Sequence, residues 1–251
     1  MRWIQKGGNN PTSTGSHSVG RNTHPITGSA KKFKLATGRG VFVLSTEELN
    51  TLGVSKSERR LVKKFLPAKG LAAGRPVKWD GKLNIIYSTG DTVGRDSEIP
   101  NLALFLRPCR PLMDARRETA NGKRKWFQLH WPRVQSLFES PGIVAVRMAK
   151  QPVFAWTDGG IYFDLSVNLI IPKNADHGKL LFLYLQTEFV KLWLKHRGKM
   201  KGGVYQVDGK PLRSIPVPDF SRFRGKQDVE SVSKFAADWF GVESEFGVDA
   251  A

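Results

Sequence analysis

The stretch "GIVAVRMAKQPVFAWTDGGIYFDLSVNLII", residues 142–171, decides the fold class. Val, Ile, Phe, Tyr and Trp dominate it, and Gly or Pro stands at each corner. Residues of these types favour β-strands, and the corners divide the stretch into runs at 142–149, 152–158 and 160–171. The "DGG" at 158–160 is typical of a hairpin turn. The sequence therefore predicts a β-rich centre.

Shorter signals precede this centre. Apolar or alternating runs predict strands at 40–45, 82–88 and 125–131. Ser45 and Ser55 each begin an S-x-x-E capping box, which is typical of a helix N-terminus.

Prolines end or interrupt two helices that we expect before residue 142. The second capping box opens an amphipathic helix, with Leu61, Val62, Phe65 and Leu66 inward, that Pro67 ends. Another helix begins near Pro100, and Pro108 and Pro111 interrupt it because proline lacks the backbone N–H that a helix needs.

Helices dominate the part of the chain after the centre. Residues 178–198 show the clearest 3.6-residue periodicity, and Gly198 stands where a helix cap belongs. A basic loop and a strand through "PLRSIPVP" follow, and 228–246 predicts a last amphipathic helix. The expected class is α/β (α+β), with a mixed, mainly antiparallel sheet core and flanking helices.

The charge of the chain points to a polyanionic partner. Forty Lys and Arg face twenty-two Asp and Glu, a net charge of +18. Residues 1–150 carry 27 basic and 10 acidic side chains, and 191–226 carry 10 and 2. The segment between them carries 2 and 4, and 227–251 carries 1 and 6. This distribution favours a body with one charged face.

Two further features bound the class of protein. The single cysteine, Cys109, excludes an internal disulfide and a Cys-rich zinc module, and we expect its thiol to be packed in the interior. The first ten residues contain no apolar signal-peptide core, and the longest hydrophobic segment is too polar and too short to span a membrane. We expect a cytoplasmic, nucleoid-associated protein.

The basic glycine-rich run "KHRGKMKGGVYQ", residues 195–206, is not a nucleotide-binding phosphate loop. Such a loop ends in Gly-Lys-Ser/Thr between a strand and a helix, whereas Val204 follows Gly203 here. The order here is helix, loop, strand, so the loop faces the negative end of the helix dipole.

No catalytic or metal-binding pattern emerges elsewhere. The "DGK" strings at 80–82 and 208–210 could supply half of a nuclease site, but they are more typical of turns, and the only "PD" lies downstream of both. The five histidines have no metal-ligand spacing, and no G-x-S-x-G elbow occurs. We assign no catalytic residue and no metal site.

Basic residues interleaved with aromatic ones are the remaining signal. "NGKRKWFQLHWPR" (121–133) and "RMAKQPVFAW" (147–156) combine both types. Lys and Arg near turns can neutralise phosphates, and Arg or Gln can reach base edges. A solvated charge run beside a core strand explains the first segment equally well.

Three blocks carry a resemblance to a known family. They are "GVFVLSTEELNTLGVSKSERRLVKKFLPAKG" (40–70), 126–172 and 180–220, with "F-E-x-P-x-I-V" (138–144) and "G-K-M-K-G-G-x-Y-Q" (198–206) as the most distinctive pieces. In this order they resemble the TaqI-like C-terminal specificity domain. That domain is the target-recognition part of adenine-N6 DNA methyltransferases in type IIG restriction–modification and related phage-defence systems.

The resemblance implies a mixed α/β target-recognition domain that reads a short double-stranded DNA sequence from the major groove. The methylase half of such proteins flips out the adenine and uses S-adenosylmethionine. Neither F-x-G-x-G nor [DNS]-P-P-[YFW] occurs here, and "NNPT" (9–12) is not a substitute. We therefore expect no methylation by this chain alone, with S-adenosylmethionine bound by a missing or partner methylase half.

The resemblance also implies an organisation of the chain. Residues 1–39 form an irregular lead-in with a connector remnant, 40–226 the DNA target-recognition domain, and 227–251 an acidic C-terminal helix or tail. The start at Met1 fits either a truncated reading frame or a separate specificity subunit that works with a methylase or endonuclease chain.

Seven residues are the candidate DNA contacts. We place Arg133, Arg147, Lys150 and Gln151 near the groove, and Lys199, Lys201 and Tyr205 on the DNA backbone. Five aromatic residues are expected in the core instead: Trp126, Trp131, Phe154, Tyr162 and Phe163. The alternatives are a self-contained nucleic-acid enzyme such as a nuclease or methylase, an RNA-binding module, and a decayed fragment.

Overall fold

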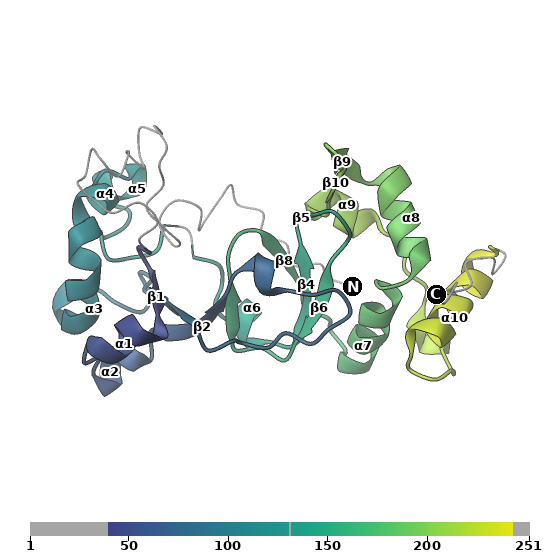
Figure 1. Ribbon diagram of the computed structural model, residues 1–251, viewed down its shortest axis with the longest axis horizontal. Helices are drawn as coiled ribbons and strands as arrows, with labels where there is room; N and C mark the ends of the chain where they lie inside the picture. Colours follow the sequence, from purple (N-terminus) through teal and green to yellow (C-terminus); the bar gives the residue numbers. More distant parts are fainter. Residues whose placement is uncertain (1–39, 131, 243–251) are drawn as a thin grey trace.

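The computed structural model describes residues 40–130 and 132–242, which form an elongated body with strands in the middle and helices at both ends (Figure 1). The predicted lead-in at 1–39 lies outside the described residues, as does Trp131. The mixed α/β class is confirmed, because three mainly antiparallel sheets are flanked by helices.

The first sheet has four strands. Its order is β1 (Val43–Ser45), β3 (Leu83–Ile86), β2 (Val62–Leu66) and β7 (Ile161–Phe163). All its pairs are antiparallel except β2 with β7, which joins segments about a hundred residues apart in a parallel pair. The sheet thus ties the N-terminal half of the chain to its centre.

The central sheet has the order β6 (Phe154–Thr157), β4 (Gly142–Val146) and β8 (Val167–Ile170), all antiparallel. Every residue of β4 is buried, because both faces of this strand are covered. Ile143 and Ala145 belong to one hydrophobic core, whereas Val144 and Val146 belong to another. Side chains alternate along a strand, so one short run serves both cores.

The third sheet is small and more exposed. It joins β5 (Met148–Ala149), β10 (Val204–Gln206) and β9 (Lys199–Lys201). Strands β9 and β10 form a hairpin in which Gly202 and Gly203 have φ of 56° and 77°. Consecutive positive φ values are typical of a type I′ turn, which glycine adopts without strain.

Short helices and 3₁₀ turns cover the first core, which contains the four-stranded sheet. The helices are α1 (Thr46–Thr51), α2 (Lys56–Arg59), α3 (Pro100–Leu106), α4 (Arg110–Asp114), α5 (Arg117–Ala120) and α6 (Ser136–Glu139). The 3₁₀ turns are η1 (Ala68–Gly70), η2 (Asp96–Glu98) and η3 (Arg107–Cys109). Pro108 and Pro111 lie where α3 passes through η3 into α4, which confirms the predicted interruption.

Among the described residues, four further helices form the second core with the other face of the central sheet. They are α7 (Ala175–Tyr184), α8 (Glu188–Arg197), α9 (Gly209–Ser214) and α10 (Val229–Phe240), with the 3₁₀ turn η4 (Phe220–Arg222). Val232 and Ala236 of α10 are buried in this core. Asp228 caps the start of α10, as predicted, but left-handed Gly241 ends the helix six residues before the predicted end at 246.

Several local predictions are confirmed. Both capping boxes form, with the Ser45 and Ser55 hydroxyls accepting from the backbone N–H of Glu48 and Glu58. Cys109 is buried. The predicted core aromatics within the described residues are also buried: Trp126, Phe154, Tyr162 and Phe163.

The helix expected from Ser55 to Pro67 is wrong beyond its first turn. Helix α2 ends at Arg59, and Val62–Leu66 forms β2 between β3 and β7. Phe65 and Leu66 are buried in the first core from this strand. Pairing on both edges of β2 outweighs the helical periodicity of the segment.

The strand expected at 125–131 is also wrong, since residues 125–130 form turns. The guanidinium of Arg116 donates to the carbonyls of Trp126 and Gln128, and the Ser88 hydroxyl donates to that of Phe127. These side chains satisfy backbone acceptors that a strand partner otherwise satisfies.

Three longer predictions are divided in the structure. The helix expected at 178–198 is two helices, because the chain turns between Tyr184 and Glu188. The strand expected at 160–171 is β7 and β8, which belong to different sheets. The strand expected at 142–149 breaks at Arg147 into β4 and β5.

Two turn and strand predictions need correction as well. Gly159 and Gly160 do adopt positive φ, but β6 and β7 on either side of them are not paired, so "DGG" is a turn without a hairpin. The "PLRSIPVP" segment begins in helix α9, and the "DGK" at 208–210 opens that helix. Among residues 40–130 and 132–242, no helix is long and apolar enough to cross a membrane.

Candidate nucleic-acid interface

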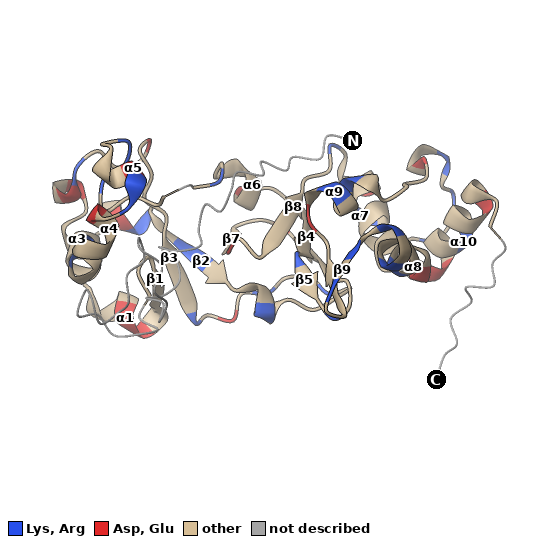
Figure 2. Cartoon of the chain, turned by 90° about the horizontal axis from the view of Figure 1, so that it is seen from above, with Lys and Arg blue, Asp and Glu red and all other residues tan. Residues whose placement is uncertain are grey.

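The small sheet brings together candidate residues from two distant parts of the sequence. Strand β9 carries Lys199 and Lys201, and β10 carries Tyr205. Tyr205 pairs with Ala149 of β5, so Lys150 and Gln151 follow directly at the end of that strand. Lys150, Gln151, Lys199 and Lys201 are all exposed. Figure 2 shows the basic colouring of β9, which is separated from β5 by β10 in the small sheet.

Register divides the side chains of this sheet between two faces. Lys199 lies opposite Gln206, and Gln206 lies opposite Met148, so these three share one face with Lys201. Tyr205 points the other way, where it packs against the second core. Tyr205 is therefore on the opposite face from the two lysines of β9.

Arg147 connects the small sheet to the central sheet. Its backbone N–H donates to Ser166 (2.8 Å), and its carbonyl accepts from Val207 (2.8 Å). Its Nη1 donates to the Leu165 carbonyl at 3.3 Å, and its Nη2 lies 4.0 Å from Asp208 Oδ2. The Nε atom is buried and has no hydrogen-bond partner.

Arg133 is not part of the small sheet, and the core holds it near Arg147. Its Nη2 donates to the Val167 carbonyl at 2.8 Å, and its guanidinium carbon lies 6.0 Å from the Phe138 ring centre. Its own carbonyl accepts from the Tyr87 hydroxyl at 2.5 Å. Burial lowers the pKa of Arg133, and the charge of Arg147 nearby lowers it further. Six of the seven predicted residues therefore lie in or next to the small sheet, with Tyr205 on the face opposite the two lysines of β9, while Arg133 binds the first residue of β8.

Two polar residues that the sequence reasoning did not select lie beside Arg147. Gln206 Nε2 donates to Asp208 Oδ2 at 2.6 Å, and the same carboxylate faces Arg147. Gln206 stands within the "GKMKGGVYQ" piece, so its position in that motif was the available signal. The "DGK" string at 208–210 predicts a turn, so the sequence pattern does not indicate the contact of Asp208 with Arg147.

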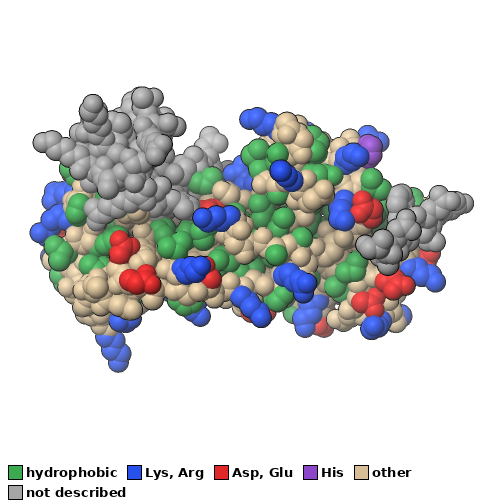
Figure 3. Space-filling view, in the orientation of Figure 1, with side chains coloured by type: hydrophobic (Ala, Val, Ile, Leu, Met, Phe, Trp, Pro, Cys, Tyr) green, Lys and Arg blue, Asp and Glu red, His purple; other side chains and the backbone are tan. Residues whose placement is uncertain are grey.

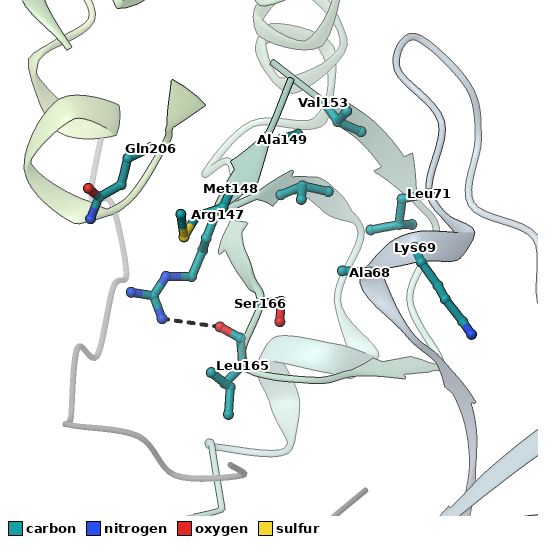
Figure 4. A pocket seen from close by; sticks show the side chains of 11 residues that line it. Ala68, Lys69, Leu71, Arg147, Met148, Ala149, Val153, Leu165, Ser166 and Gln206 are labelled. Carbon is teal, nitrogen blue, oxygen red and sulfur yellow. Dashed lines mark hydrogen bonds between the residues drawn. The ribbon is translucent and has the colours of Figure 1, made fainter. Parts of the chain in front are cut away.

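A pocket of about 560 Å³ opens next to these residues (Figure 4). Its walls are mostly apolar, and they come from the η1 turn, β4, β5 and the loop before β8. The lining residues are Ala68, Lys69, Leu71, Val146, Arg147, Met148, Ala149, Val153, Leu165, Ser166 and Gln206. Arg147 and Gln206 lie on one side of it and Lys69 on the other (Figure 4).

The surrounding surface mixes basic and apolar side chains. In the space-filling view, blue side chains are distributed over the face of the body with hydrophobic ones between them (Figure 3). Met148 and Met200 of the small sheet are 52% and 43% exposed. Within the described ranges, no three His, Cys, Asp or Glu side chains are grouped so that they could hold a metal ion.

Comparisons with known proteins find chains that are similar in sequence and in fold. No protein-family profile matches the chain. The chain is similar to the type II methyltransferase M.BanIII of Aneurinibacillus aneurinilyticus, at 27% identity over 155 residues, which is 59% of this chain and 26% of that protein.

A solved structure shares the fold. The type IIL restriction–modification enzyme MmeI, in complex with DNA, superposes with a TM-score of 0.59 at 10% sequence identity. The match covers 97% of this chain and 34% of that one. The chain thus spans about a quarter of the methyltransferase and about a third of the enzyme to which it is similar.

Proposed function

We propose that the chain is the specificity domain of an adenine-N6 DNA methyltransferase from a phage-defence restriction–modification system, and that it recognises a short duplex DNA sequence. The observation that carries the proposal is the small sheet, whose exposed lysines adjoin Arg147, Gln206 and the pocket. The similarity to M.BanIII and the fold shared with the DNA-bound enzyme MmeI support the same conclusion.

The two kinds of side chain divide the work of binding. Lys150, Lys199 and Lys201 are exposed, and their ammonium groups neutralise phosphates without reading sequence. Arg147 and Gln206 carry donors and acceptors suited to base edges. The net charge of +18 adds long-range attraction to the polyanion.

We also propose that this chain does not methylate DNA by itself. A methylase half, in the same longer protein or in a partner subunit, binds S-adenosylmethionine and holds the flipped adenine. The absence of both methylase motifs from the sequence supports this division. Methyl transfer to duplex DNA by the purified chain contradicts it.

The binding experiment uses fluorescence anisotropy with a pool of random duplexes over a range of salt. The logarithm of the association constant falls with the logarithm of salt by about 0.9 per phosphate neutralised. Replacing Lys199 and Lys201 with Gln is expected to reduce this slope by about 2. Lys56→Gln is the matched control, because Lys56 is exposed on α2 at the other end of the body.

Two outcomes contradict the proposal. One is no retention of any duplex at low salt by the folded chain. The other is an RNA that displaces duplex DNA at equal concentration, which favours an RNA-binding module instead.

A further inference from the structure

Arg147, Gln206 and Asp208 form a connected polar cluster at the mouth of the pocket. Gln206 Nε2 donates to Asp208 Oδ2 at 2.6 Å, and Arg147 Nη2 lies 4.0 Å from that same oxygen. Arg147 and Gln206 both line the pocket. The side chain of Arg147 is 39% exposed and that of Asp208 is 21% exposed, so the cluster is accessible to a large ligand.

The backbone beneath this cluster is fixed from both sides. The Val207 N–H donates to the Arg147 carbonyl at 2.8 Å, and buried Asn168 donates from Nδ2 to the Val207 carbonyl at 3.0 Å. Val207 itself is 1% exposed. The two neighbours of Val207 are Gln206 and Asp208, so both side chains start from a rigid position, as a preorganised recognition site requires.

The side chain of Asp208 takes part in this cluster and does not cap helix α9. It occupies the N-cap position of α9, where an Asp side chain ordinarily accepts from a backbone N–H of the first turn. Its side chain makes no such hydrogen bond here. The carboxylate faces Gln206 and Arg147 instead, which identifies Asp208 as a positioning residue for the other two.

The positions of donors and acceptors then specify a ligand. Because the Gln206 amide nitrogen donates to Asp208, its Oε1 is the atom left for a ligand, and this oxygen can only accept. Arg147 is held through Nη1 at Leu165, and its Nη2 makes only the loose approach to Asp208. The cluster therefore presents a cationic donor next to a neutral acceptor.

A G·C base pair matches this arrangement in the major groove. Guanine offers two acceptors, N7 and O6, which are the base atoms that arginine contacts most often, and the cytosine amino group beside them is a donor. An A·T pair offers only one acceptor, adenine N7, before its amino donor, and it carries a methyl group. Resting on the proposed function, we propose that this cluster reads one G·C pair. Arg147 donates to guanine, Gln206 Oε1 accepts from the cytosine amino group, and Asp208 orients both side chains.

The test selects binding sites from a randomised duplex pool with the full chain and its variants. The wild type is expected to fix G·C at one position. Gln206→Ala and Arg147→Ala are expected to reduce the preference for G·C at that position by roughly tenfold or more, and to leave the preferences at the other positions unchanged. Lys201→Ala, the control, lowers affinity about equally for all sequences because it removes a phosphate contact.

The positioning role of Asp208 has its own readout. Asp208→Ala is expected to relax the same position, while its unfolding temperature stays close to wild type because no helix cap is lost. Asp208→Asn keeps an acceptor for Gln206 but loses the charge facing Arg147, so it retains part of the preference. A residue that served stability alone lowers the affinity for every duplex in proportion to the unfolded fraction.

The outcomes separate the two proposals. A wild type that binds duplexes but fixes A·T there, or variants that keep the G·C preference, overturns the inference and leaves the proposed function standing. A folded wild type that binds no duplex contradicts the proposed function, and the inference falls with it.

Discussion

Glu58 is a fully buried carboxylate that joins two distant helix starts. It accepts from the Ser55 N–H at 3.0 Å as part of its own capping box. It also accepts from the backbone N–H of Asn101 at 2.9 Å and of Leu102 at 3.0 Å, at the start of α3. The side chain of Ile99, the N-cap residue of α3, makes no capping hydrogen bond. Glu58 caps the helix instead, 43 residues before Asn101 in the sequence.

The pKa of Glu58 yields a prediction about acid stability. Burial raises this pKa, but hydrogen bonds from Asn101, Leu102 and Ser55 outweigh it and lower the pKa to about 2. A carboxylate whose pKa is lower in the folded than in the unfolded state stabilises the fold at pH values above the unfolded-state pKa. This contribution is lost as pH falls from about 4.5 toward 2. Glu58→Gln is therefore expected to cost about 3 kcal/mol at neutral pH and roughly half of that near pH 3.

Urea unfolding at the two pH values measures this difference. Glu188→Gln is the control, because Glu188 pairs with Lys191 at the surface, where such pairs contribute about 0–1 kcal/mol. An equal loss at both pH values for Glu58→Gln contradicts the assignment of the charged carboxylate.

At the scale of elements, the starts of the two helices with capping boxes were predictable, whereas helix lengths were not. The capping boxes at Ser45 and Ser55 depend on residues three apart, which the sequence shows directly. The end of α2 at Arg59 depends on β3 and β7, because the next segment pairs with both of them as strand β2. Distant partners of this kind leave no mark on the local pattern.

The β9–β10 hairpin yields a prediction at this scale. Gly202 has φ of 56° and no atom near its potential Cβ, so only the backbone conformation resists substitution. Gly202→Val is expected to destabilise the hairpin by about 1–2 kcal/mol, because a β-branched residue is strained at positive φ. Amides at 199–206 should then exchange roughly tenfold faster.

Gly202→Asn is the matched control, since Asn adopts positive φ readily in type I′ turns. Its exchange rates are expected to stay near wild type. If the Asn and Val variants exchange equally fast, the turn conformation is not the cause.

At the scale of the whole molecule, the central sheet couples two cores. Adjacent residues of β4, Ile143 and Val144, are each 0% exposed but face opposite cores. Strand β8 does the same with Leu169 and Ile170. Neither core can lose its packing while the sheet stays intact for the other, so the described body is expected to unfold as one unit.

Calorimetry tests this coupling. Ile143→Ala in the second core and Val144→Ala in the first are each expected to lower the temperature of the single unfolding transition. The larger deletion, Ile143→Ala, is expected to reduce the free energy of unfolding by about 2–5 kcal/mol. Leu104→Ala is the control, because Leu104 is 57% exposed on α3. Two separable transitions, of which each variant moves only one, contradict the coupling.

The candidate site shows how far the sequence reasoning reached. Basic residues at 147–151 and 199–205 were selected by type and by motif, and pairing of β5 with β10 brings them together. Arg133 was selected for the same reason, but its guanidinium is bound to the Val167 carbonyl. Gln206 and Asp208 were missed, because Asp208 meets Arg147 across about sixty residues of sequence and Gln206 binds that same carboxylate.

The sequence by itself determined the charge and the local structural signals of this protein. These are its excess of basic charge, its helix caps, its proline breaks and the apolar run that becomes β4. These depend on single residues or on neighbours a few positions apart. Only the tertiary structure decided which runs are strands, which strands share a sheet and which side chains meet at the pocket. The reason is physical, because a backbone segment takes the partner that satisfies its hydrogen bonds and buries its apolar face, and that partner lies far along the chain.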